Sequence, residues 1–120
     1  MKLNSSMFAE PEYQPISAWT GHVPFGAWLV QQLDPGILVE LGTYYGMSYA
    51  AFCQSIAANG LKSRCYAVDT WTGDEHTGEY DETVYNEFVR NNKKYEQFST
   101  VLRMSFDDAA SQFSDESIDL

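Results

Sequence analysis

Basic residues are scarce in this sequence: Lys and Arg total 7, against 17 Asp and Glu, so the formal net charge is −10. An acidic surface repels a phosphate backbone, which argues against a nucleic-acid partner. Long apolar runs are also missing, and none approaches the about 18 residues of a membrane-spanning helix. The N-terminus carries a single early lysine, Lys2, and no signal-peptide core. We therefore expect no membrane attachment.

Cysteines are few as well. Cys53 and Cys65 each lie in a segment that reads as buried, so we interpret both as core thiols of a protein that resides in the reducing cytoplasm. The chain has 120 residues and no internal repeat, which leaves room for one small domain. Hydrophobic residues make up 44% and aromatic residues 15%, enough for a packed core and against general disorder.

The chain divides into an N-terminal arm, residues 1–20, and a domain, residues 21–120. The arm contains Pro11 and Pro15 and has no apolar periodicity. In the domain, apolar spacings of three and four predict helices, and continuous apolar runs predict strands buried on both faces. Helices are expected at about 24–33, 46–59, 81–95 and 107–113, strands at 37–42, 64–70 and 99–104, and a polar loop at 71–79.

Alternating helices and strands predict an α/β fold with a parallel sheet and helices on both faces. Residues 117–120 resemble the opening of a fourth strand, where the chain stops. Ligand crevices of such sheets need strands on both sides of the first one. We therefore expect a fold truncated after the start of the fourth strand, or one that a second copy completes. An uncovered strand edge favours a homo-oligomer.

The run from Val39 to Ser48 joins the first strand to a helix through two glycines, Gly42 and Gly46. Glycine allows positive φ and close approach of a ligand to the backbone. The helix start offers unpaired N–H groups to a carboxylate or phosphate, and the Ser48 hydroxyl adds a donor. A tight turn without a ligand is the alternative interpretation.

Asp69 ends the second predicted strand, about 20 residues after the glycine turn, where an acid can bind ribose hydroxyls. The alternative is a turn cap acting with Thr70 and Thr72. A dinucleotide site requires a glycine where Tyr44 stands, and no P-loop lysine follows. The turn thus favours an amino-acid carboxylate over a pyrophosphate, and an NAD-dependent oxidoreductase is the weaker alternative.

The segments ELGTYYGMS and YAVDTW resemble the cofactor half of class I S-adenosylmethionine methyltransferases. With AWTGHVPF and the following RCYAVDTWTGDEHTG, the pattern is similar to bacterial methyltransferases of the Methyltransf_24 type, over about residues 18–120. The resemblance implies a Rossmann-like fold, S-adenosylmethionine as cofactor, and O-methylation of a small hydroxyl acceptor. A sugar is the expected acceptor, because these enzymes often accompany glycosyltransferases in polysaccharide biosynthesis.

The resemblance also implies roles for individual residues. Glu40 lies near the amino group of the methionine moiety, Ser48 binds its carboxylate, and Asp69 holds the ribose. Trp71 flanks the adenine, and Ser105 lies near the loop that contacts it. The complete expected cofactor set is Glu40, Gly42, Thr43, Tyr44, Gly46, Ser48, Asp69, Thr70, Trp71 and Ser105.

The catalytic base stays unassigned. The loop 73–78 brings two carboxylates and His76 together, which suits a divalent metal or a base, but a solvated loop is the simpler interpretation. We interpret His22 as a capping or packing residue. The 120 residues alone are expected to be inactive, and a non-catalytic module that self-associates is the main alternative to an enzyme.

Overall fold

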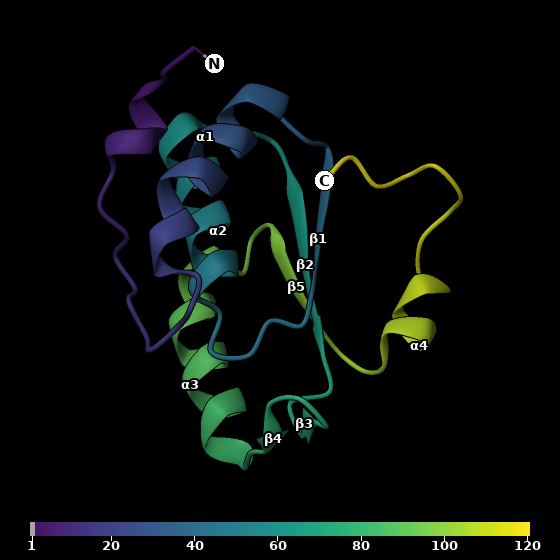
Figure 1. The fold of residues 1–120 in the computed structure, drawn as a ribbon. Helices are drawn as coiled ribbons and strands as arrows, with labels where there is room; N and C mark the ends of the chain where they lie inside the picture. Colours follow the sequence, from purple (N-terminus) through teal and green to yellow (C-terminus); the bar gives the residue numbers. More distant parts are fainter. Residues whose placement is uncertain (1) are drawn as a thin grey trace.

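The computed structural model describes residues 2–120, which form a parallel sheet with helices on both faces (Figure 1). Strands β1 (Ile37–Leu41), β2 (Arg64–Asp69) and β5 (Ser99–Arg103) lie in the order β1-β2-β5. Both pairings are parallel, with Ile37 opposite Arg64 and Cys65 opposite Ser99. The architecture confirms the predicted α/β, Rossmann-like fold.

Three helices cover one face of the sheet and a short one lies on the other (Figure 1). The first face carries α1 (Val23–Leu33), α2 (Met47–Asn59) and α3 (Glu82–Asn92), and α4 (Phe106–Ala110) lies on the second. Their ends follow ordinary capping rules. Asp81 caps α3, Ser105 caps α4, and Gly60 ends α2 in the left-handed conformation.

The core lies between the sheet and the three helices. Its fully buried side chains include Leu38 of β1, Tyr49 of α2 and Trp71 after β2. Cys53 and Cys65 are buried, free thiols, as the sequence predicted. Burial raises the pKa of the Cys53 thiol, which keeps it protonated and unreactive.

The last residues of the chain lie along the outer edge of β1. Asp119 N donates to Ile37 O over 2.9 Å, and Val39 N donates to Leu120 O over 2.8 Å. Although these residues do not form a full strand, they pair where the sequence predicted a fourth strand to open. β1 therefore has neighbours on both sides, the arrangement that creates a crevice at the carboxyl end of a parallel sheet.

Three predicted elements differ in detail. The stretch 71–79 contains a short hairpin of β3 (Gly73–Asp74) and β4 (Gly78–Glu79). Two-residue strands are too short for apolar alternation to reveal them. The helix expected at 81–95 ends at Asn92 and continues as a 3-10 turn, η3 (Lys93–Tyr95). The helix expected at 107–113 is α4, which ends at Ala110.

The N-terminal residues pack against the helical face. The 3-10 turn η1 (Ser5–Phe8) lies on α1, and Trp28 Nε1 donates to Lys2 O over 2.7 Å. Further on, Tyr13 OH donates to Glu87 of α3. A second 3-10 turn, η2 (Thr20–His22), leads directly into α1. Within residues 2–120, no helix combines the length and the apolarity needed to cross a lipid bilayer.

Candidate functional site

Two clefts adjoin at the carboxyl ends of β1 and β2. The first, here the β2 cleft, has a volume of about 390 Å³. The second, here the α2 cleft, has a volume of about 460 Å³. Gly42 and Tyr44 line both. The β2 cleft is completed by Asp69, Thr70, Gly73, Asp74, Thr77, Tyr80, Ser105 and Phe106, and the α2 cleft by residues 17–19, His22, Thr43 and residues 45–48.

The glycine turn between the clefts has an unusual backbone. Gly42, Tyr44 and Gly46 have φ values of 82°, 53° and 88°. A Cβ on Gly46 would lie 2.5 Å from the Phe88 ring, so both φ and space require glycine there. Hydrogen bonds to both its N–H and its carbonyl group hold Tyr44 in the left-handed region. Its N–H donates to Asp69 Oδ2 over 2.9 Å, and its carbonyl accepts from Trp71 Nε1 over 2.8 Å.

Glu40 places a buried carboxyl group behind the α2 cleft. Ser48, which lines that cleft, donates its hydroxyl hydrogen to Glu40 Oε2. Within residues 2–120, Glu40 Oε1 is buried and makes no hydrogen bond of normal geometry, and neither does the buried Thr43 hydroxyl, although that hydroxyl lies close enough to Glu40 to lower its pKa. Burial raises the pKa of Glu40 to about 7; the Ser48 and Thr43 hydroxyls act against this rise, and the negative charge of Asp69 adds to it. A buried acceptor of this kind calls for a donor, best a cationic one.

The start of α2 is the second polar feature of the α2 cleft. Its N-cap, Gly46, makes no side-chain capping bond, so the first N–H groups of this 13-residue helix lack a protein side-chain acceptor. Aligned N–H groups at a helix start bind carboxylates. Since the Ser48 hydroxyl donates to Glu40, the backbone provides the anion-binding donors in this structure.

Asp69 connects the two clefts. Besides Tyr44 N, it accepts Trp71 N at Oδ1 over 2.9 Å, and Tyr80 OH donates to Oδ1 over 3.3 Å. Asp69 thus caps the turn through Trp71 N, and not through Thr70 and Thr72, which bond to each other. The residue is only 8% exposed, yet it lines the β2 cleft beside Thr70. A carboxylate has about four lone-pair sites, so these contacts leave capacity for a ligand hydroxyl.

The expected role of Trp71 at the adenine is wrong in this structure. Its indole is 1% exposed, stacks on Phe88 with ring centroids 5.0 Å apart, and lines neither cleft. A side chain that is packed so tightly in the core has no free face for a base. Phe106 instead presents a half-exposed ring to the β2 cleft, next to Ser105.

The loop 73–78 is organised as a turn. Asp74 Oδ1 accepts the N–H groups of His76 and Thr77 over 2.8 and 2.7 Å. Hydrogen bonds from Thr77 and His76 lower the pKa of Asp74. Within residues 2–120 no group of three or more His, Cys, Asp or Glu side chains is placed to hold a metal ion.

The cleft residues outside the sequence-predicted cofactor set include Trp19, His22, Tyr80 and Phe106. His22 packs edge-on against Trp19 with centroids 5.8 Å apart, which agrees with the packing interpretation, but it also lines the α2 cleft. Tyr80 follows the hairpin and packs edge-on against Tyr44. Trp19 and His22 belong to the AWTGHVPF segment, whereas no periodicity or motif marks Tyr80 or Phe106, which the fold brings to the β2 cleft.

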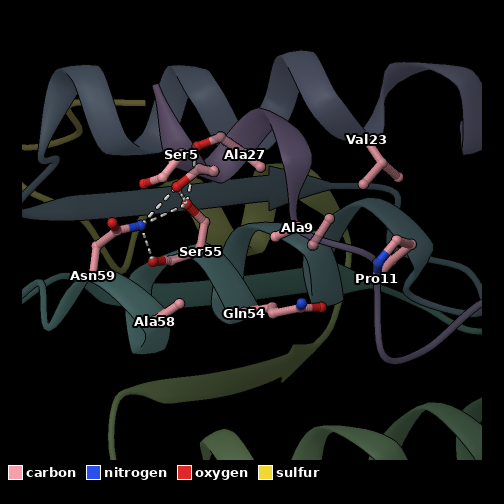
Figure 2. A pocket seen from close by; sticks show the side chains of 11 residues that line it. Ser5, Ala9, Pro11, Val23, Ala27, Gln54, Ser55, Ala58 and Asn59 are labelled. Atoms are coloured by element: carbon pink, nitrogen blue, oxygen red, sulfur yellow. Dashed lines mark hydrogen bonds between the residues drawn. The ribbon is translucent and has the colours of Figure 1, made fainter. Parts of the chain in front are cut away.

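Another cavity, of about 220 Å³, lies between the N-terminal arm, α1 and α2 (Figure 2). Its polar groups bind one another. Asn59 Nδ2 donates to Ser6 Oγ over 2.8 Å, and Ser55 Oγ donates to Ala27 O over 2.9 Å. Among residues 2–120, no Asp, Glu, His, Lys or Arg side chain lines this cavity.

Comparison with known proteins adds two findings. The family described as "Methyltransferase domain" matches residues 39–120, which include the glycine turn, Asp69 and Ser105. The uncharacterized protein y4gI of Sinorhizobium fredii (strain NBRC 101917 / NGR234) is 47% identical over 121 residues. That alignment covers the whole of this chain but only 13% of the length of y4gI.

Proposed function

Because this chain belongs to the methyltransferase-domain family, we propose that its two clefts bind S-adenosylmethionine. The α2 cleft takes the methionine end and the β2 cleft the nucleoside. The cofactor supplies an electrophilic methyl group when bound. The activity itself is a property we propose for the whole protein, since the chain spans 13% of the length of its curated relative.

The observation that carries this proposal is the buried, unpartnered Glu40 Oε1. An unpaired carboxylate in the interior is costly, and a protonated amine offers both the charge and the donors that it lacks. The buried Thr43 hydroxyl nearby can both donate and accept, so it offers a ligand a second polar contact. The start of α2 offers N–H groups to a carboxylate in the same cleft. An α-amino acid group carries both complementary charges.

The nucleoside end is supported by the β2 cleft. Asp69 retains acceptor capacity for ribose hydroxyls, and Thr70 lies beside it. Phe106 offers an aromatic face and Ser105 a hydroxyl at the far side of the same cleft. These residues bind and orient the cofactor, so their contribution to the reaction is alignment of the reactants. We further propose that the acceptor is a sugar or another small hydroxyl compound, as the resemblance implies.

Glu40→Gln tests the proposal. The substitution keeps the shape and the Ser48 contact but removes the negative charge. We expect affinity for S-adenosylhomocysteine, measured by titration calorimetry at pH 8, to fall about ten- to a hundred-fold, the value of a charge-assisted hydrogen bond. The midpoint of thermal unfolding should not fall, because the variant no longer buries an unpaired carboxylate.

The matched control is Glu96→Gln, the same chemical change at an exposed position outside both clefts. It should leave the affinity unchanged. Equal affinity of Glu40→Gln and the unmodified chain would show that Glu40 does not contact the ligand, and absence of binding by the unmodified chain would contradict the proposal as a whole.

A further inference from the structure

The wall of the α2 cleft that faces the glycine turn is made by a segment outside the proposed cofactor set. Ser17, Trp19 and His22 line it, and Thr43 and Ser48 line the opposite wall. Methyl transfer requires the acceptor oxygen to contact the carbon that is transferred. An acceptor must therefore enter an opening that the proposed cofactor residues share, and the α2 cleft is such an opening.

The position of this wall is well defined by packing. Trp19 packs edge-on against Phe52 of α2 with centroids 5.4 Å apart. It also lies against α1 so closely that a Cβ on Gly26 would be 2.5 Å from its ring. The 3-10 turn η2, which carries His22, is closed by His22 N, which donates to Trp19 O over 2.9 Å. The wall is thus a preformed surface, as expected of a binding site.

On this wall the Ser17 hydroxyl accepts a hydrogen bond from Trp19 N over 3.0 Å, whereas the Trp19 indole N–H and the His22 imidazole make none within residues 2–120. Two of the three indole N–H groups, those of Trp28 and Trp71, donate to backbone carbonyls. Tyr44 and Tyr45 add two further aromatic rings to the cleft. Aromatic faces with unpaired polar tips suit a ligand that carries both C–H surface and hydroxyl groups.

The charges around the clefts indicate a neutral ligand. In the described part of the chain, residues 2–120, no Lys or Arg lines the α2 or the β2 cleft. The ionisable acids at or behind them are Glu40, Asp69 and Asp74. Because the proposed cofactor carboxylate takes the N–H groups at the start of α2, an anionic acceptor would meet these carboxylates with no Lys or Arg side chain to pair with, which disfavours phosphate- or carboxylate-bearing molecules.

We infer that Ser17–His22 is the acceptor-binding wall, and that it selects a neutral, hydroxyl-bearing acceptor through Trp19 and His22. The inference rests on the proposed function, because it takes the opposite wall as the cofactor site. His22 acts here as a binding residue: its imidazole accepts or donates a hydrogen bond to an acceptor hydroxyl.

The test follows the indole N–H signals of the isotope-labelled chain by NMR, in the presence of S-adenosylhomocysteine. The probes are glucose, galactose and mannose, compared with glucuronate and galacturonate. We expect the neutral sugars to shift the Trp19 signal but not the Trp28 signal, which serves as an internal reference. His22→Phe, which keeps a ring against Trp19, should lower the affinity for the neutral sugars about three- to ten-fold, the value of one hydrogen bond.

His76→Phe is the matched control, since His76 is the other histidine and lines neither cleft. It should leave the sugar response unchanged, and Trp19→Phe should remove the shifted signal while calorimetry shows cofactor-product binding kept. If S-adenosylhomocysteine binds but no sugar moves Trp19, or the charged sugars move it as much, the inference is wrong and the proposed function stands. If S-adenosylhomocysteine fails to bind, the proposed function is wrong.

Discussion

Glu40 differs from the other acids of this chain because its carboxyl group is buried with one oxygen unpaired. Burial raises its pKa from the ordinary 4.5 to about 7. The folded state therefore holds a proton that the unfolded chain releases between about pH 4.5 and 7. By linkage, this group stabilises the fold fully below pH 4.5, and its contribution is lost as pH rises through 7.

Glu40→Gln makes this dependence measurable. At about 1.4 kcal/mol per pKa unit, the unmodified chain should lose about 3 kcal/mol of unfolding free energy relative to the variant between pH 4.5 and 8. Denaturant titrations of both chains at the two pH values provide the comparison. A constant difference between them would mean that Glu40 has an ordinary pKa. For the same reason, binding of an amine to Glu40 should tighten as pH rises through 7.

At the scale of elements, the start of α2 depends on Gly46. Gly46→Ala would place a methyl group 2.5 Å from the buried Phe88 ring, in addition to the strain of φ 88°. Gly60→Ala, at the other end of α2, introduces only the strain of a positive φ, since no atom of residues 2–120 lies within 4 Å of the added Cβ. We expect Gly60→Ala to cost about 1 kcal/mol of unfolding free energy and Gly46→Ala about 3 kcal/mol.

Chemical denaturation of the two variants, read by circular dichroism, checks this difference. Because Phe88 stacks on Trp71, which in turn bonds to Tyr44, Gly46→Ala should also weaken S-adenosylhomocysteine binding, whereas Gly60→Ala should not. Equal losses in the two variants would show that Phe88 moves aside without cost.

The elements themselves followed largely from local sequence. Pro24, Asp81 and Gly60 mark the helix ends at or near the observed positions, because caps depend on neighbouring residues alone. The hairpin of β3 and β4 could not be predicted from the local sequence, because its strands are two residues long and are held by the Asp74 side chain.

At the scale of the whole molecule, the β1 edge is only partly covered. Asp119 and Leu120 pair with its first residues, while Leu41 and Ile118 remain 58% and 46% exposed. Exposed apolar groups at a sheet edge favour pairing with another chain. We therefore expect the 120-residue chain to self-associate.

Size-exclusion chromatography with light scattering measures this directly. Leu41→Asp and Ile118→Asp should each shift the chain toward the monomer, because a charge at the edge opposes pairing. Phe8→Asp, at a more exposed apolar position on the N-terminal arm, is the control and should leave the mass unchanged. A monomer across the accessible concentration range would contradict self-association.

The sequence by itself determined the order of helices and strands, the burial of both thiols, the glycine turn and the position of Asp69. Each of these depends on the periodicity or chemistry of adjacent residues. The tertiary structure decided which side chains reach the clefts. It buried Trp71 against Phe88, and it brought Tyr80, Phe106 and the wall Ser17–His22 beside the turn. The face that a side chain presents depends on packing partners far away in the chain, and no local pattern carries that information.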